Sequence, residues 1–332
     1  MGTDSPFITI GIASYNYARF LPEAFDRLRQ QKFRDYEVLY CDDGSTDNSV
    51  EVIRGFMQDN PDMNIRLIQA ENGGILANKN RILENARGQY LMICDADDYM
   101  SPNCLELLCG AAQRENADCV IGAFQEVDND HRVLKSHLLP KNPSKWLYSQ
   151  HHAQIYKTEL VRGNGIRFTD IPDDVPYLQT MHTYCQKTAY VYEPVYFWRQ
   201  HNDSVSKDIA VHKEWSPVPI WTKLVKQMLQ VKTLLKKHED LTAIDYYLYK
   251  YYYINTFACQ SKDVQKVSAQ LKEIQKQMKQ AMANYQKISC FFTACKTGDT
   301  VFAKTMVIGC WLLERLGLLH FLIKVRTFIN AK

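Results

Sequence analysis

The first 130 residues alternate between short apolar runs and longer segments whose apolar residues recur every three to four positions. The short runs are rich in β-branched and aromatic residues and predict strands, whereas the longer segments predict helices that bury one face. The predicted strands are Phe7–Ala13, Tyr36–Cys41, Asn64–Gln69, Tyr90–Cys94 and Cys119–Val127. The predicted helices are Phe20–Gln31, Asn48–Met57, Ile75–Ala86 and Pro102–Arg114. This order is typical of an α/β domain with a mostly parallel, twisted sheet and helices on both faces.

Polar clusters follow three of these strands at the point where each strand ends. They are Ser14–Asn16, Asp42–Ser45 and Asp95–Asp98. In open α/β sheets, ligands bind beyond the carboxyl ends of the strands. The sequence therefore predicts that three distant segments form one binding site at one edge of the sheet.

The last of these clusters places three carboxylates within four positions, in the stretch LMICDADDYM. A solvated loop that caps the next helix is the ordinary outcome for an Asp-rich turn. However, the preceding strand is apolar on both faces, and carboxylates this close repel one another unless a cation compensates them. A hard divalent cation with oxygen ligands that holds a substrate diphosphate would provide this compensation.

The rest of the chain differs in pattern and in charge. The pattern is less regular from residue 130 to 210 and is helical from residue 211 onward. Residues 1–210 carry 21 Lys and Arg against 29 Asp and Glu, whereas residues 211–332 carry 19 against 8. We therefore expect a catalytic domain over 1–210 and a smaller, basic helical region over 211–332, which could contact an anionic surface.

Four motifs together resemble the family-2 glycosyltransferases, which have the GT-A fold, a Rossmann-like α/β fold. They are IASYNYARF, CDDGSTD, NGGILANKN and CDADDYMSP, in the family's order and at ordinary spacing. The resemblance covers about residues 7–125 and implies that the chain binds a nucleotide-sugar. The positions that it implies for nucleotide or phosphate contact are Ala13, Tyr15, Asp42, Asp43, Lys79, Asp95, Ala96 and Arg199.

The resemblance also implies individual roles for several of these residues. Asp43 corresponds to the aspartate that accepts a hydrogen bond from the uracil ring, and Asp95 to the one near the ribose. Asp97 corresponds to the aspartate that binds Mn²⁺ or Mg²⁺. Asn16 is expected to fix its loop, and Lys79 either meets a phosphate or points into solvent.

A sugar transfer with inversion needs a general base that takes the proton of the acceptor hydroxyl. The family supplies this base as the second residue of an "ED" pair, and Asp173-Asp174 stand at that position here. We predict Asp174 as the base, with Asp173 and Asp170 as alternatives. Asp174 could instead be only the N-cap of a helix over Val175–Gln186.

The stretch YFWRQHNDSVSK resembles a further family motif, which implies that Arg199 and His201 approach the diphosphate or the metal. His151 and His152 are adjacent, and adjacent side chains point apart in both strands and helices. We therefore expect this histidine pair to be structural, or to line the acceptor pocket, and do not expect it to bind a metal.

The C-terminal segments 300–316 and 318–329 are apolar but interrupted by charges, and no apolar run is long enough to span a membrane. We expect them to lie on an anionic membrane surface, with Trp311 and Phe321 in contact with it, or alternatively to pack within the protein. The N-terminus lacks signal-peptide features, and the ten cysteines contain no C-x-x-C. These features favour a cytoplasmic protein with reduced thiols on the inner face of the plasma membrane. We see no nucleic-acid motif and expect no nucleic-acid partner.

Together these features predict a metal-dependent, inverting hexosyltransferase. It would transfer a sugar from a UDP-sugar to a hydroxyl of a glycan or lipid-linked saccharide, in bacterial capsule, exopolysaccharide or lipopolysaccharide synthesis. A nucleotidyltransferase is an alternative, although its first loop should contain glycines and ASYNYARF has none. A non-catalytic protein that binds sugar nucleotides is another, and it would not need Asp174.

Overall fold

The computed structural model describes residues 5–148, 150–169 and 174–201, and beyond these 225, 228, 230–235, 238–258, 264–281, 299–319, 321–323 and 325. The chain forms two compact units. The first contains Met1–Leu139 and Ser149–His201, and the second contains Pro140–Tyr148 and Asn202–Lys332. The boundary predicted at residue 210 stays a prediction, because it falls outside the described residues.

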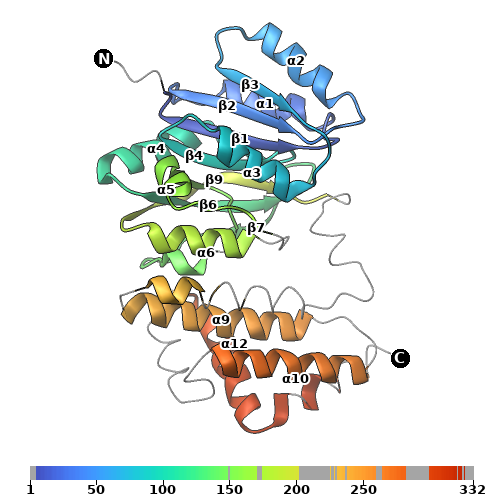
Figure 1. Ribbon diagram of the computed structural model, residues 1–332, viewed down its shortest axis with the longest axis vertical. Coiled ribbons are helices and arrows are strands. Elements are labelled where there is room, and N and C mark those ends of the chain that lie inside the picture. Colours follow the sequence, from blue (N-terminus) through green and yellow to red (C-terminus); the bar gives the residue numbers. More distant parts are fainter. Residues whose placement is uncertain are drawn as a thin grey trace. The chain divides into compact units, whose positions relative to one another are not determined.

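The first half of the sheet in the first unit has the predicted parallel arrangement (Figure 1). Its strands are β1 (Ile8–Ser14), β2 (Tyr36–Asp42), β3 (Ile65–Gln69) and β4 (Tyr90–Asp95), in the order β3-β2-β1-β4. Every residue of β1 and β2 is buried, as expected for parallel strands that are covered on both faces. The register aligns Ala13 with both Cys41 and Asp95, so the three strands end at the same edge.

The predicted helices are present, and each starts and ends within two residues of its expected position. They are α1 (Leu21–Arg29), α2 (Ser49–Asp59), α3 (Ile75–Asn85) and α4 (Cys104–Glu115). The helix α3 lies over β1 and β2 in Figure 1. Gly11 in β1 permits this close approach, because a Cβ at this position would overlap Ile82 of α3.

The second half of the sheet is mixed, so the prediction of a mostly parallel sheet is correct only for β1 to β4. The short strand β8 (Gln154–Lys157) lies between β4 and β6 (Cys119–Val127) and is antiparallel to both. On its other side β6 pairs in parallel with β9 (Thr188–Arg199). Beyond β8, on the same side as β8, the end of β6 pairs antiparallel with β7 (Val133–His137). The two-residue strand β5 (Tyr99–Met100) completes the sheet beside β9.

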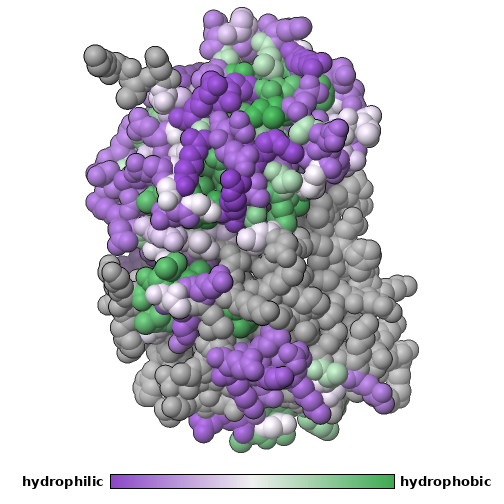
Figure 2. Space-filling model, viewed as in Figure 1, coloured by the Kyte–Doolittle hydropathy of each residue, from purple (hydrophilic) through white to green (hydrophobic). Residues whose placement is uncertain are grey.

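Two further helices of the first unit flank this part of the sheet. The short helix α5 (Thr158–Gly163) follows β8 directly, and α6 (Asp174–Tyr184) begins at the predicted base. Hydrophilic side chains cover most of the described surface of this unit in the view of Figure 2. The seven described cysteines, six in this unit and Cys310 in the second, are free and buried, as predicted for reduced thiols.

The second unit is helical, as predicted. Its described elements are a 3₁₀ turn (Lys145–Leu147) and the helices α9 (His238–Ala258), α10 (Val264–Ala281) and α12 (Val301–Arg315). Buried Glu314 of α12 accepts hydrogen bonds from the hydroxyls of Tyr252 and Tyr253, both at 3.0 Å, and so joins α12 to α9. The described part of the chain contains no helix long and apolar enough to cross a membrane.

Candidate active site

The predicted polar clusters lie together at the carboxyl ends of β1, β2 and β4. The register pairs Ser14 with Asp42 and Ala13 with Asp95. In the first loop, Asn16 has a left-handed backbone (φ 59°), and its Oδ1 accepts hydrogen bonds from the amides of Thr46 at 2.8 Å and Asp47 at 3.2 Å. The expected role of Asn16 in fixing this loop is therefore confirmed.

The two aspartates at the end of β2 have different partners. Asp42 holds its own turn, because its carboxylate accepts hydrogen bonds from the Ser45 amide at 3.0 Å and from the Ser45 hydroxyl at 2.5 Å. Asp43 accepts hydrogen bonds from the amides of Gly73 at 3.1 Å and Gly74 at 2.8 Å, where α3 begins. Both carboxylates are buried, so each fixes the backbone around the predicted uracil site. Tyr15, by contrast, is 43% exposed at the end of β1.

The structure brings together the two predicted metal ligands. His201 Nε2 lies 2.7 Å from Asp97 Oδ2, and both residues are buried. The second ring nitrogen of His201 has no hydrogen-bond partner in the described part of the chain. A carboxylate and an imidazole side by side at the end of β4 are a ligand pair that fits a divalent ion.

Asp98 is a buried residue of this turn to which the sequence analysis gave no individual role. Its carboxylate accepts hydrogen bonds from the Tyr196 hydroxyl at 2.7 Å and the Arg199 amide at 2.8 Å. Burial raises the pKa of Asp98 well above its usual value, and the nearby charges of Asp97 and Asp95 raise it further. Asp98 thus anchors the acidic turn to β9.

Arg199 supports the same turn from within the protein, and the contact with the diphosphate or the metal predicted for it stays a prediction. Its Nε donates a hydrogen bond to the carbonyl of Asp97 at 2.8 Å, and its Nη2 donates to Glu23 at 2.5 Å. The guanidinium also lies over the rings of Phe20 and Tyr99 and is buried. Through these contacts Arg199 holds Asp97 in position.

Lys79 does not point into solvent, which was one of the two orientations expected for it. Its ammonium is buried, 3.2 Å from Asp174 Oδ1 and 3.6 Å from Asp95 Oδ1. Burial alone would lower the pKa of Lys79, but the two carboxylates outweigh it and raise this pKa. Lys79 therefore joins the predicted base to the predicted ribose-binding aspartate.

His151 and His152 also reach this cluster, so the expectation that their side chains point apart is wrong. They lie in a turn before β8, where the alternation of a regular strand does not apply, and their ring centroids are 4.8 Å apart. His151 Nδ1 is 2.6 Å from Asp174 Oδ2, and the Nε2 atoms of both histidines face Asp95 Oδ2. The cluster of Lys79, Asp95, His151, His152 and Asp174 is called the charge cluster below.

The ionisation of the charge cluster follows from its pairing. Burial alone would raise the pKa of Asp174, but His151 and Lys79 lower it below its usual value. Burial would also raise the pKa of Asp95, but Lys79 and His151 hold this pKa well below its usual range. Burial would lower the pKa of His151, yet Asp174 and Asp95 raise it to about 9. Asp174 is thus held as a carboxylate at neutral pH. The alternative bases Asp170 and Asp173 lie outside the described residues.

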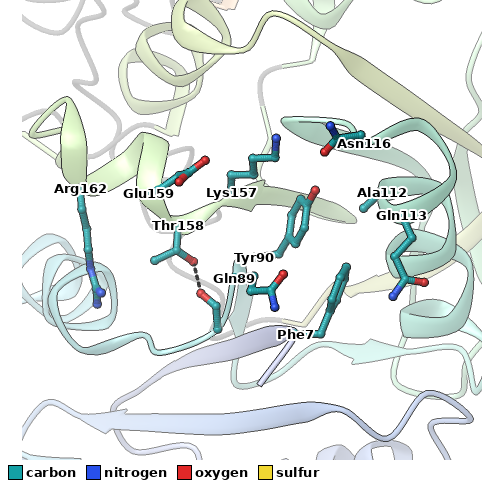
Figure 3. A pocket seen from close by; sticks show the side chains of 11 residues that line it. Phe7, Gln89, Tyr90, Ala112, Gln113, Asn116, Lys157, Thr158, Glu159 and Arg162 are labelled. Atoms are coloured by element: carbon teal, nitrogen blue, oxygen red, sulfur yellow. Dashed lines mark hydrogen bonds between the residues drawn. The ribbon is translucent and has the colours of Figure 1, made fainter. Parts of the chain in front are cut away.

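A cavity of about 620 Å³ lies at the opposite edge of the sheet, next to the amino ends of β1 and β4 (Figure 3). Several of its polar groups already bond within the protein. The Thr158 hydroxyl donates to the Gly88 carbonyl at 2.6 Å, the Tyr90 hydroxyl donates to the Ala117 carbonyl at 2.6 Å, and the Lys157 ammonium is paired. We therefore assign the candidate site to the carboxyl edge.

The mixed sheet and the acidic turn at the end of β4 define the class of protein, a glycosyltransferase with the GT-A fold. The sequence profile of the family Glycosyl transferase family 2 matches residues 9–182. The chain belongs to this family, and the resemblance drawn from its motifs is confirmed.

Similar proteins include several glycosyltransferases of bacteria. Glycosyltransferase GlyG of Streptococcus pneumoniae serotype 4 is 26% identical over 229 residues, which cover 61% of this chain and 74% of GlyG. Chondroitin synthase of Pasteurella multocida is 38% identical over 102 residues, which are 31% of this chain and only 10% of that protein. Uncharacterized glycosyltransferase EpsJ of Bacillus subtilis is 24% identical, and the match covers 61% of this chain and 63% of EpsJ.

Two solved structures share the fold. TarS 1-349 of S. aureus in complex with UDP-GlcNAc has a TM-score of 0.65 at 17% identity, covering 93% of this chain and 92% of that chain. The mannosyltransferase PcManGT of Pyrobaculum calidifontis, in complex with GDP-Man and Mn²⁺, has a TM-score of 0.53 at 15% identity, covering 99% of this chain and 88% of that chain. At these identities the similarity shows the GT-A architecture alone.

Proposed function

We propose that the chain is a metal-dependent, inverting transferase that moves a sugar from a UDP-sugar to a hydroxyl of a glycan or lipid-linked saccharide. One observation carries this proposal: Asp174 shares two partners, Lys79 and His151, with Asp95 of the acidic turn. A residue predicted to act on the acceptor thus lies beside one predicted to hold the donor. The chondroitin synthase similarity and the TarS complex with UDP-GlcNAc support a UDP-sugar and a polysaccharide product.

The proposed reaction is a single displacement at C1 of the donor sugar. Asp174 takes the proton of the acceptor hydroxyl as the acceptor oxygen forms its bond to C1, and UDP leaves with the electron pair of the broken C1–O bond. An α-linked donor then gives a β-linked product. Asp97 and His201 would hold Mn²⁺ or Mg²⁺, which supplies positive charge against the leaving diphosphate. Arg199 and Asp98 keep the acidic turn in place throughout.

The metal and donor requirements can be tested together on the full-length protein. We expect UDP-sugars to raise the melting temperature in the presence of MnCl₂ or MgCl₂, and one of them to yield free UDP when an acceptor saccharide is added. EDTA should remove both effects, because the acidic turn would then repel the diphosphate. GDP-mannose serves as the matched control donor. Turnover that EDTA leaves unchanged would contradict the metal requirement, and turnover with GDP-mannose alone would contradict the assignment of UDP.

We also propose that α12 binds an anionic membrane surface, which would place the enzyme near a lipid-linked acceptor. Large apolar side chains are exposed on and just after this helix, with Phe302 81% exposed, the C-cap residue Leu316 70% exposed and Phe321 61% exposed. Exposed apolar residues next to basic ones are typical of interfacial helices. Trp311 is buried within the second unit, so the membrane contact predicted for it is wrong. Half of the predicted segment 318–329 lies outside the described residues.

We expect the protein to sediment with vesicles that contain phosphatidylglycerol and much less with vesicles of phosphatidylcholine alone. Replacing Phe302 and Leu316 by Ser should reduce binding to the anionic vesicles several-fold, since both apolar contacts are lost. Leu134, which is 57% exposed on β7, provides a control substitution to Ser elsewhere on the chain. Equal binding of the α12 variant and the control variant would refute a membrane role for this helix.

A further inference from the structure

Two histidines and one aspartate of the charge cluster converge around a single point. Asp95 ends β4, and His151 and His152 precede β8, the strand that pairs with β4. His151 Nε2 lies 3.4 Å from Asp95 Oδ2, and His152 Nε2 lies 3.9 Å from the same oxygen. The three ligand atoms all lie within 4.8 Å of one another.

The imidazole nitrogens that face Asp95 make no hydrogen bond in the described part of the chain, and His152 Nε2 also lies 3.7 Å from Asp98 Oδ2. His151 is 2% exposed and His152 is 4% exposed, so water does not reach them freely. His151 Nε2 and both ring nitrogens of His152 have no hydrogen-bond partner in the described part of the chain. Buried polar atoms usually have hydrogen-bond partners, so the two Nε2 atoms that face one carboxylate need an explanation. A ligand at the point shared by these two nitrogens and Asp95 Oδ2 would satisfy both of them.

The second nitrogen of His151 has the partner that a metal-binding histidine usually has. Its Nδ1 is 2.6 Å from Asp174 Oδ2, so in the neutral imidazole Nδ1–H donates to this carboxylate and Nε2 offers its lone pair toward Asp95. A bound ion would take the place of the proton that Nε2 carries in the imidazolium form. A carboxylate behind the imidazole fixes its tautomer and orientation in metal sites. The other oxygen of Asp95, Oδ1, faces Lys79, which leaves Oδ2 for the shared point.

We propose that Asp95, His151 and His152 form a site for a first-row divalent transition-metal ion, separate from the Asp97–His201 pair. Two imidazole nitrogens and one carboxylate oxygen suit Mn²⁺, Co²⁺ or Zn²⁺, whereas Mg²⁺ and Ca²⁺ prefer oxygen ligands alone. Bonds of about 2.1 Å place opposite ligands about 4.2 Å apart, so the widest separation would close by a few tenths of an ångström on binding. In the proposed transferase this site would favour some divalent ions over others, and His151 would connect the bound ion to Asp174. Binding of the ion can be measured without any sugar transfer.

The test uses the full-length, metal-free protein and MnCl₂ without nucleotide. Electron paramagnetic resonance of free Mn²⁺ measures binding, and pulsed measurements detect nitrogen nuclei bound to the ion. We expect a tightly bound Mn²⁺ with couplings to two imidazole nitrogens. We also expect a large excess of Mg²⁺ to displace it poorly.

Three variants identify the ligands. His152→Gln should weaken Mn²⁺ binding at least tenfold and remove one nitrogen coupling, whereas His201→Gln should leave both couplings in place. His131→Gln, at a histidine whose side chain is 44% exposed, is the matched control and should bind as the wild type does. The proposal fails if His152→Gln binds Mn²⁺ unchanged, or if His201→Gln removes the nitrogen signal.

Two further measurements distinguish a failure of the proposed metal site from misfolding of the variant and from a failure of the proposed function. If His152→Gln does not fold, the wild-type spectrum decides, because zero or one nitrogen coupling would refute the site. UDP release is measured in parallel on the same samples. Two nitrogen couplings without turnover with any donor would contradict the proposed function alone, whereas turnover with no imidazole-bound ion would contradict this site alone.

Discussion

Replacing Asp174 by Asn is expected to lower kcat for sugar transfer by about 10²–10⁴-fold, the range that a positioned general base contributes. Asn is nearly isosteric and can still accept a hydrogen bond from Lys79, which lies 3.2 Å from Asp174 Oδ1. It cannot accept the proton of the acceptor hydroxyl. The loss should therefore appear in kcat, while the affinity for UDP should change by less than about threefold, because Asp174 is not among the residues predicted to contact the nucleotide.

The measurement combines UDP release under saturating donor with calorimetric titration of UDP and a melting curve for each variant. Asp173→Asn and Asp170→Asn are the matched controls, since they test the two alternative bases by the same change. We expect both to retain most of the activity. If Asp174→Asn keeps more than a tenth of the wild-type kcat and one of the controls does not, the base is the other aspartate.

Sequence patterns alone predicted the parts of the fold in which the local periodicity of apolar residues matches their burial. β1, β2 and β4 are mostly apolar runs, interrupted by Thr9 in β1 and Glu37 in β2, that end in polar clusters, and parallel strands buried on both faces have this pattern. Because such strands end at one edge, the meeting of Asp43, Asp95 and Asp97 followed from topology. The pairing of Asp97 with His201, 104 positions apart, came from the family motif and has a short distance in the structure.

The rest of the site depends on tertiary contacts that leave little local signal. β8 has only four residues, and nothing in QIYK indicates that it separates β4 from β6 in an antiparallel direction. The position of β8 between β4 and β6 brings His151 and His152 next to Asp95. Because both histidines lie in a turn, the alternation of side chains in a regular strand does not predict their directions. Lys79 and Arg199 are also long side chains whose direction no short sequence window determines. The family motifs thus identified which residues lie near the site, but not which of them face one another.

Replacing Lys79 by Met is expected to destabilise the protein by about 1–3 kcal/mol at pH 7, because Asp95 and Asp174 lose one of their two cationic partners and keep only His151. The ammonium contacts both Asp95 and Asp174, and its side chain is only 7% exposed. Met keeps the length and packing of the stem and removes only the charge, so a cavity is not the cause of the loss. Lys135→Met is the control, since the Lys135 side chain is 64% exposed in its pair with Glu126. An exposed pair of this kind contributes less than about 1 kcal/mol.

The difference in the free energy of unfolding between wild type and Lys79→Met should depend on pH if it comes from lost charge pairing, and should not if it comes from lost packing. The pKa values of Asp95 and Asp174 are lowered in the folded protein, so the unfolded chain binds protons at a higher pH than the folded chain does. Their stabilising contribution is complete above about pH 4, the usual carboxyl range, and is lost as the pH falls through the folded values. Lys79 is one cause of both shifts, so urea unfolding should show the gap between wild type and Lys79→Met narrowing below about pH 4. A gap that stays constant from pH 7 to pH 3 would mean that Lys79 stabilises the fold by packing, and the electrostatic link between donor site and base would have to be abandoned.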